Sequence, residues 1–416
     1  MSRRGLITLI AVFVTTRVFT GYLADHPEHY GPAESKVTGD TVSYEYWAGQ
    51  ILVNHVNPYS EIGIEYPPGS LPFIVTPGIE KPLDDTYRTR FVLLMMGVDL
   101  AGFLVLLVLA RRWGSVLGPW LWVAVVPLLG PISYNRLDLV PAVATILAVE
   151  RFSARSWFGG GGWLGYGVVA KVYPALFLPV AFAAARRKQV VVGAAVVAFL
   201  FLVPHLGFLD DVYRNVVGYH TDRGIQIESL WGFVLLLASK FGHAIGINYS
   251  FGALHVGSEL EPPLKAVAQV LSLGFVAAGV WLAHRWAREG RPASAPELAG
   301  IMFMTMAGTM AVGSVFSPQF MLWLGALAAA ALCDRSTWLR VPALAVLPAA
   351  LMTQFVYPFF YGRLVAVEIP ALVLLASRNF LVLFIAVEAF LALRARTGAA
   401  ESEQEATPAL AGEAVS

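Results

Sequence analysis

The chain has 416 residues, of which 57% are hydrophobic and 14% are charged, whereas soluble globular proteins carry roughly 25% charged residues. The net charge of +1 gives no electrostatic reason to expect a nucleic-acid partner, and the single cysteine, Cys333, excludes an intramolecular disulfide. Many apolar runs approach about 20 residues, the length that an α-helix needs to cross ~30 Å of hydrocarbon. The sequence therefore predicts an all-α, polytopic integral membrane protein.

Hydrophobic runs mark the candidate membrane spans, and basic residues flank the short connections between them. The runs are 5–23, 91–110, 116–132, 138–150, 162–185, 189–206, 264–284, 297–315, 319–333, 339–358 and 377–394. Because arginine and lysine accumulate on the cytoplasmic side, this pattern places both termini in the cytoplasm. The first run resembles a signal peptide, but it has no evident small-residue cleavage site, so we expect it to be retained. The long connections 24–90, 207–228 and 247–263 then lie outside, where we expect the function.

Two segments do not fit a simple alternation of spans. Residues 162–185 have basic groups at both ends and contain Pro174, which interrupts helical hydrogen bonding. We therefore expect a hairpin of two short helices that turns near Lys171–Pro174. Residues 229–246 are apolar enough to span, but a crossing there would place Arg285 and Arg291 outside. A re-entrant or interfacial helix on the outer face fits better.

The first outer connection contains the acidic and aromatic stretch TGDTVSYEYW, residues 38–47. Asp40 follows a glycine, and its carboxylate could be the general base that takes a proton from an acceptor hydroxyl. It could equally be the N-cap of an amphipathic helix that runs through Leu52. On such a helix Glu45 is turned away from the N-terminal end, which leaves it a candidate for substrate binding but not for the base.

The same connection continues into Glu65-Tyr66-Pro67-Pro68-Gly69. Residues that precede proline are kept out of the α region, so this segment is expected to be extended and stiff. Glu65 and Tyr66 could form a fixed wall of a sugar pocket. Alternatively, the segment is a plain loop breaker with an exposed carboxylate.

Charged residues also occur within or beside the apolar runs. Arg136 and Asp138, in SYNRLDLVPA, could pair with one another, or Arg136 could contact a phosphate. Lys171 lies at the break of the predicted hairpin, and intramembrane lysines are functional candidates because they are costly to bury. Alternatively, the Lys171 side chain reaches the outer membrane interface and contributes little to function. Asp99 could neutralise either Lys171 or Arg17.

Two further outer segments carry polar side chains. Residues 220–229, HTDRGIQIES, contain His220, Arg223 and Glu228; His220 and Arg223 could grip a phosphate, since arginine offers a forked set of donors. A solvated connector is the alternative. Gln319, in FSPQF, could hydrogen-bond a sugar hydroxyl or a phosphate, although a Ser-Pro break alone indicates only a turn. We predict that Lys171, Arg223 and His220 converge on one phosphate group.

Motifs for soluble nucleotides and metals are absent from the sequence. There is no Walker loop, no GxGxxG, no HExxH and no Asp-x-Asp in the outer loops. A soluble nucleotide-sugar site is therefore not expected, and neither is a cofactor. The scattered histidines show no metal-ligand spacing, so a divalent metal is neither required nor excluded.

Six stretches in a fixed order carry a resemblance to a known family. They are TGDTVSYEYW, EYPPG, NRLDLVPA, VVAKVYPALFLP, RGIQIESLWG and FSPQFMLWL. Together they resemble glycosyltransferase family 87 of the GT-C superfamily, over roughly residues 5–395. This family includes polyprenyl-phosphate-mannose-dependent α-mannosyltransferases.

The resemblance implies a GT-C bundle of about 10–13 transmembrane helices, with short amphipathic helices in the first outer loop. It also implies that Asp40 is the catalytic base of a multi-pass plasma-membrane enzyme with an extracytoplasmic active site. The expected partners are the lipid bilayer, a polyprenyl-phosphate sugar donor and a glycolipid or glycan acceptor. Residues 1–396 would form one domain, followed by a disordered cytoplasmic tail, 397–416.

The main alternative is a transporter or flippase of lipid-linked sugars. Transporters of this kind show paired repeats and broken helices near the membrane midplane. The chain has one predicted broken hairpin but no matching half. The distribution of polar residues separates the two functions, because a transferase needs them at the outer surface and a transporter at the midplane and both faces.

Overall fold

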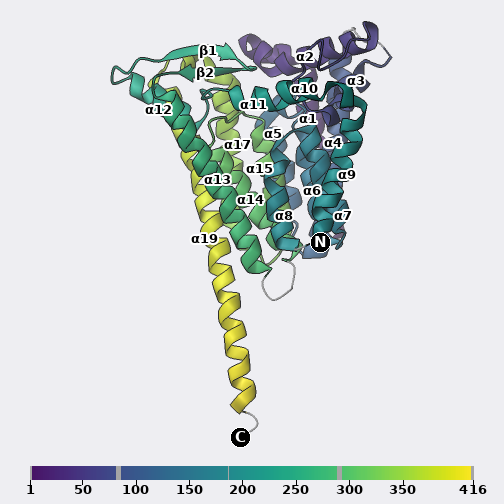
Figure 1. The fold of residues 1–416 in the computed structure, drawn as a ribbon, viewed down its shortest axis with the longest axis vertical. Coiled ribbons are helices and arrows are strands. Elements are labelled where there is room, and N and C mark those ends of the chain that lie inside the picture. The colour runs from purple at the N-terminus through teal and green to yellow at the C-terminus, as the bar shows by residue number, and fades with distance from the viewer. Residues whose placement is uncertain (1, 81–85, 186, 288–292, 414–416) are drawn as a thin grey trace.

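The computed structural model describes residues 2–80, 86–185, 187–287 and 293–413, with side chains described as far as Arg396. Within these residues the secondary structure is helical except for one two-stranded hairpin, which confirms the expected all-α membrane fold. Figure 1 shows a helical bundle with both chain ends toward its lower end and a layer of short helices at its upper end.

Seven helical stretches among the described residues are long and apolar enough to cross a membrane. They are α1 (Arg3–Asp25), α4 (Tyr87–Trp113), Lys188–Asp222, which begins with α9 (Lys188–Leu202), α13 (Glu261–Trp286), α14 (Ala295–Val312), Arg340–Phe359, which contains α16 (Arg340–Leu344) and α17 (Val346–Gln354), and the first part of α19 (Ile369–Glu413). Helix α19 continues to Glu413 and so enters the segment 397–416. The expected disorder of this segment stays a prediction.

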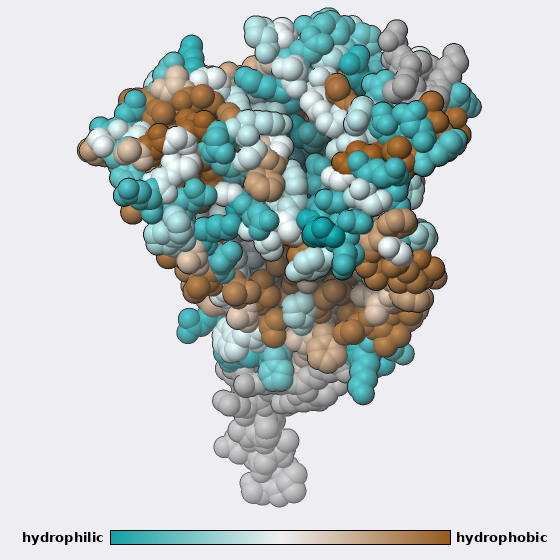
Figure 2. All heavy atoms as spheres, turned by 45° about the horizontal axis from the view of Figure 1, so that its top comes forward, coloured by the Kyte–Doolittle hydropathy of each residue, from teal (hydrophilic) through white to brown (hydrophobic). Residues whose placement is uncertain are grey.

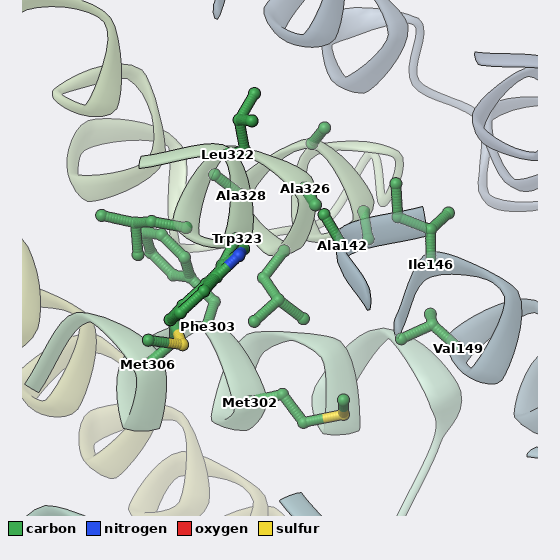
Figure 3. Close-up of a cluster of buried hydrophobic side chains, with 14 of the residues drawn as sticks. Ala142, Ile146, Val149, Met302, Phe303, Met306, Leu322, Trp323, Ala326 and Ala328 are labelled. Atoms are coloured by element: carbon green, nitrogen blue, oxygen red, sulfur yellow. The ribbon is translucent and has the colours of Figure 1, made fainter. Parts of the chain in front are cut away.

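Shorter helices form the centre of the bundle. They are α5 (Leu117–Leu129), α6 (Leu139–Ser153), α7 (Trp157–Ala170), α8 (Phe177–Ala185) and α15 (Phe320–Leu332). Helix α15 is buried from its second residue to its last. Figure 3 shows its Trp323 beside Phe303 and Met306 of α14, with Ile146 of α6 in the same cluster. This packing joins α6, α14 and α15 in the buried centre of the bundle.

Glycine allows α7 and α9 to pack at very short range. A Cβ atom on Gly161 would lie 2.0 Å from the carbonyl oxygen of Val190, and one on Gly165 would lie 2.4 Å from that of Ala194. Small residues let membrane helices approach in this way and gain close van der Waals contact. The glycine-rich run at the start of α7 therefore serves packing.

The expected hairpin at residues 162–185 is confirmed. Helix α7 ends at Ala170, Lys171 is extended with φ −163° and ψ 128°, and a short 3₁₀ turn (Tyr173–Leu176) leads into α8 at Phe177. Pro174 lies in that turn, as its lack of an N–H donor requires. The break places Lys171 at the upper ends of α7 and α8 (Figure 1).

Residues 229–246 do not form a spanning helix. Helix α12 (Leu230–Ser239) has ten residues, about 15 Å at 1.5 Å per residue, which is too short to cross the hydrocarbon. It is followed by strands β1 (Gly246–Ser250) and β2 (Ala253–Gly257), which pair antiparallel with Gly246 opposite Gly257. The interfacial or re-entrant interpretation fits this geometry, whereas the strands were not expected.

The long connections gather at the end of the bundle opposite the chain ends. This end carries α2 (Glu34–Val53), α3 (Leu71–Val75), α10 (Leu209–Val212), α11 (Tyr219–Asp222), α12 and the β1–β2 hairpin (Figure 1). Figure 2 shows hydrophilic residues over much of this end and hydrophobic residues concentrated on the sides below it. The structure thus concentrates its irregular elements at one end, and the assignment of that end to the outer side stays a prediction.

Candidate active site

A cavity of about 780 Å³ opens at the end of the bundle that carries the short helices. Its walls come from α2, the Glu65–Pro67 segment, the break at Lys171, residues 219–228, the β1–β2 hairpin and the start of α15. Nine predicted site residues line it: Asp40, Glu65, Tyr66, Arg136, Lys171, His220, Arg223, Glu228 and Gln319. Asp138 lies behind Lys171, and Glu45 does not line the cavity.

Asp40 is held inside a helix and does not cap one. Helix α2 begins at Glu34 after Ala33, whose side chain makes no capping hydrogen bond, so the N-cap interpretation of Asp40 is wrong. The Asp40 carboxylate forms an ion pair with Arg136 and accepts a 3.4 Å hydrogen bond from the Tyr44 hydroxyl. Its side chain is 25% exposed and lines the cavity, so it combines a fixed orientation with access to a ligand.

Arg136 connects α2 to the loop that precedes α6. Its guanidinium pairs with Asp40 and also donates to the backbone carbonyl of Lys36 at 3.4 Å. The hydroxyl of Tyr357 donates to the same carbonyl at 2.7 Å. The proposed pairing of Arg136 with Asp138 is therefore wrong, because each of the two residues has its partner on another element.

Asp138 pairs with Lys171, 33 residues away in the sequence. The Lys171 Nζ lies 2.9 Å and 3.0 Å from the two carboxylate oxygens of Asp138. It also lies 5.1 Å from the ring centre of Tyr66 and 5.5 Å from that of Trp323. Lys171 thus lines the cavity, and the Asp138 carboxylate neutralises its charge. The alternative of an unpaired lysine at the outer interface does not fit this geometry.

The sequence left open whether Asp99 pairs with Lys171 or with Arg17. It forms a buried ion pair with Arg17 at 2.8 Å and accepts hydrogen bonds from Trp122 Nε1 and Tyr134 Oη, each at 2.6 Å. Of the two partners considered, Asp99 therefore neutralises Arg17 and not Lys171. This pair stabilises the bundle beside α4 and α5 and does not line the cavity.

Arg223, unlike Arg136 and Lys171 in the same cavity, has no ion pair among the described residues. It is only 9% exposed, and its Nε has no hydrogen-bond partner there. Its guanidinium lies 5.5 Å from the ring centre of Tyr219. His220 lines the same cavity, so Lys171, Arg223 and His220 lie around one space, whereas their convergence on a phosphate stays a prediction. The unpaired positive charge of Arg223 and its unused N–H donor suit an anionic ligand.

Two carboxyl groups in the cavity are perturbed by burial. Burial raises the pKa of Glu65 to about 7, although Lys171 and Arg223 oppose the shift. Burial also raises the pKa of Glu228 to about 7, against the opposing effects of Arg378 and Arg136. Glu65 is only partly exposed, so the interpretation of an exposed loop carboxylate is wrong. Both groups change protonation near neutral pH.

Tyr66 is held by hydrogen bonds at its side-chain hydroxyl and at its backbone carbonyl. Its hydroxyl lies 2.8 Å from that of Tyr44, and its carbonyl accepts a 3.0 Å hydrogen bond from the Tyr59 hydroxyl. The Ser70 hydroxyl donates to the Pro67 carbonyl at 2.7 Å. The Glu65–Gly69 segment therefore forms the stiff wall that its prolines predict.

Residues that the sequence did not single out hold two walls of the cavity together. Gln226 Oε1 accepts from the Phe316 backbone N–H at 3.0 Å and from the Ser317 hydroxyl at 3.3 Å. Arg378 of α19 is fully buried, donates to the Glu228 carbonyl and lies 3.7 Å from the ring centre of Phe316. An arginine inside an apolar run was the available signal for Arg378.

Metal binding has no evident site in the part of the chain that the structure describes. No group of three or more histidine, cysteine, aspartate or glutamate side chains is placed there to hold an ion. The expectation that a metal is not required stays a prediction.

One comparison identifies a family. Residues 65–318, more than half of the 416-residue chain, match the model of glycosyltransferase family 87. The matched region begins at Glu65 and so contains most of the cavity residues, but not Asp40. No curated protein matches the chain.

Proposed function

The chain belongs to glycosyltransferase family 87, and from this premise we propose that it transfers a hexose from a polyprenyl-phosphate donor to a hydroxyl of a glycolipid or glycan, with inversion. Mannose is the proposed sugar. The observation that carries the proposal is the single cavity in which the Asp40 carboxylate and the Arg223 guanidinium, from separate elements, face the same space.

The reaction is a direct displacement at the anomeric carbon. The acceptor oxygen forms a bond to this carbon while its proton passes to the Asp40 carboxylate. The bond from the carbon to the phosphate oxygen breaks, and polyprenyl phosphate leaves with the electron pair. A single displacement inverts the anomeric centre, so a β-linked donor gives an α-linked product.

Arg223 is the main group that stabilises the leaving phosphate. Positive charge aimed at the position where negative charge develops lowers the barrier more strongly in a site shielded from water. Lys171 lies in the same cavity, but Asp138 offsets its charge at 2.9 Å. Lys171 therefore orients the phosphate and the Tyr66 wall, whereas Arg223 supplies the net charge. Gln319 lines the cavity at the start of α15 and is placed to donate to a sugar hydroxyl or to the phosphate.

The position of the cavity favours a transferase over a transporter. The cavity lies at one end of the bundle, with α2 and the β1–β2 hairpin, and away from the chain ends (Figure 1). At the opposite end, helix α1 begins at Arg3 and the last turn of α4 carries Arg111 and Arg112. By the positive-inside rule we propose that the cavity faces the extracytoplasmic side of the plasma membrane.

Transfer of label tests the proposal directly. Membranes that contain the protein are incubated with radiolabelled polyprenyl-phosphate mannose, and the label in lipid and glycan fractions is followed. Label in a product that an α-mannosidase releases supports inverting transfer from a β-linked donor. Intact donor that only changes leaflet, with no labelled product, would instead indicate a flippase.

Labelling of single cysteines tests the orientation. Ser60→Cys and Ser258→Cys are introduced in a chain whose buried Cys333 is replaced by alanine. An impermeant thiol reagent is expected to label both positions in intact cells. Labelling only after lysis would contradict the proposed topology.

A further inference from the structure

The cavity mouth lies between two elements that approach from opposite sides. Figure 1 shows β1 running across the upper end of the bundle with its arrowhead toward α2. Helix α2 contributes Gly39 and Ser43 to the cavity, and the hairpin contributes Tyr249, Phe251 and Gly252. The base proposed above, Asp40, is therefore on one side of the mouth and an aromatic turn is on the other.

The turn of the hairpin holds a bulky residue in a backbone conformation that such residues avoid. Phe251 has φ 48° and Gly252 has φ 67°, the two positive angles of a tight hairpin turn for which Asn-Gly is the usual sequence. A phenylalanine with positive φ is an outlier. Backbone strain of this kind clusters at active sites and ligand-binding sites. The Phe251 ring lines the cavity, and its centre lies 5.3 Å from that of the Tyr219 ring.

Tyr249 is an exposed residue at the cavity mouth. Its side chain is 75% exposed although it lines the cavity mouth. Phe241, two residues after the end of α12, is 83% exposed and does not line the cavity. The two aromatic residues therefore provide a matched pair, in which only Tyr249 is placed to contact a ligand.

Gly39 leaves space on the other side of the mouth. It lies within α2, where alanine would favour the helix by about 1 kcal/mol. A Cβ atom at this position would meet nothing within 4 Å, so packing against the rest of the protein does not require glycine. The gap lies next to Asp40, where an acceptor hydroxyl has to approach.

We propose that the space between Gly39 and the hairpin turn is the acceptor subsite, in which a pyranose ring of a glycan or glycolipid headgroup stacks on Tyr249 and Phe251. The inference rests on the proposed function. Aromatic rings offer an apolar face that suits the C–H face of a sugar ring. The donor phosphate is assigned to Arg223 and Lys171, so the exposed mouth is left for the acceptor. A cavity of about 780 Å³ is large enough for several sugar units.

Steady-state kinetics with octyl α-mannoside and octyl α-glucoside as acceptor probes test the subsite. Tyr249→Ala and Phe251→Asn are each expected to raise the KM of the accepted glycoside on the order of tenfold and to leave the donor KM unchanged. Phe241→Ala is the control and should change neither value. Because asparagine tolerates positive φ, Phe251→Asn should keep the midpoint of thermal unfolding close to that of the parent.

A binding measurement separates this inference from the proposed reaction. Saturation-transfer NMR records contact between mannotriose and the protein in nanodiscs, without donor. If the parent transfers no sugar but binds mannotriose, and Tyr249→Ala loses that binding while Phe241→Ala keeps it, the subsite stands and the proposed reaction fails. If transfer occurs and Tyr249→Ala and Phe251→Asn keep the parental acceptor KM, the subsite is wrong. An equal rise of both KM values, or the same effect from Phe241→Ala, also overturns it.

Discussion

Replacing Lys171 with methionine removes one charge of a buried ion pair and leaves the other in place. Asp138 is fully buried and the Lys171 side chain is 12% exposed, with both carboxylate oxygens within 3.0 Å of Nζ. Breaking a buried pair by removing one partner costs about 3–5 kcal/mol, because the remaining charge is uncompensated. Lys171→Met should therefore lower the free energy of unfolding by about 3–5 kcal/mol.

The double variant Lys171→Met/Asp138→Asn removes the charge of both partners. Replacing a whole buried pair is often close to neutral, so the double variant should recover most of the lost stability. Its transfer rate should stay within about tenfold of the parent, because the neutralised pair contributes little net charge to the leaving phosphate.

Thermal unfolding in one detergent, together with initial transfer rates, measures both effects. The parent, the two single variants and the double variant form a double-mutant cycle, which isolates the coupling between the side chains. A Lys171→Met variant as stable as the parent would refute the burial argument. A double variant that folds well but loses more than ~10²-fold in transfer would show that Lys171 itself supplies the phosphate charge.

Three other expectations follow from single side chains. Arg223→Met should lower kcat by about 10²–10³-fold with unchanged thermal stability, and near-parental transfer would remove Arg223 from the phosphate site. The Glu228 carboxyl has a pKa of about 7 when folded and a lower value when unfolded, so stability contributed by its protonated form is lost as pH rises from ~4.5 through 7. The unfolding midpoint of Glu228→Gln should therefore fall less over this range than that of the parent, and parallel curves would contradict the shift. Gly165→Val should prevent folding, because its Cβ would lie 2.4 Å from the Ala194 carbonyl oxygen; normal yield and stability would show that α7 and α9 can separate at little cost.

The sequence predicts the elements whose signals are local. The break at Lys171–Pro174 follows from a proline inside an apolar run with basic residues at both ends. The convergence of Glu65, His220 and Arg223 follows from their occurrence in long connections that the positive-inside rule predicts on one side of the membrane. These signals need only neighbouring residues and one topological rule.

Pairings between distant residues could not be predicted. Asp40 and Arg136 are almost 100 residues apart, and a nearby charge, Asp138, offered an equally good partner in the sequence. The start of α2 was misplaced because Ala33 provides no capping side chain, while Asp40 and Thr41 resemble one. The β1–β2 hairpin was missed because Phe251-Gly252 lacks the usual Asn-Gly turn signal.

The role of Asp40 is tested most directly by comparing the chemical step with donor binding in Asp40→Asn. Asparagine keeps the size of the side chain and can still accept a hydrogen bond from Arg136, but it leaves the charge of the 10% exposed Arg136 side chain unpaired. Thermal unfolding is therefore measured beside transfer, and the comparison is made on folded protein. Single-turnover transfer should fall by ~10²-fold or more, while the affinity for polyprenyl phosphate stays within about twofold of the parent. Glu45→Gln, on the same helix but outside the cavity, should transfer normally. Near-parental transfer by Asp40→Asn, with transfer abolished in Glu65→Gln, would show that the base is Glu65 and contradict the account.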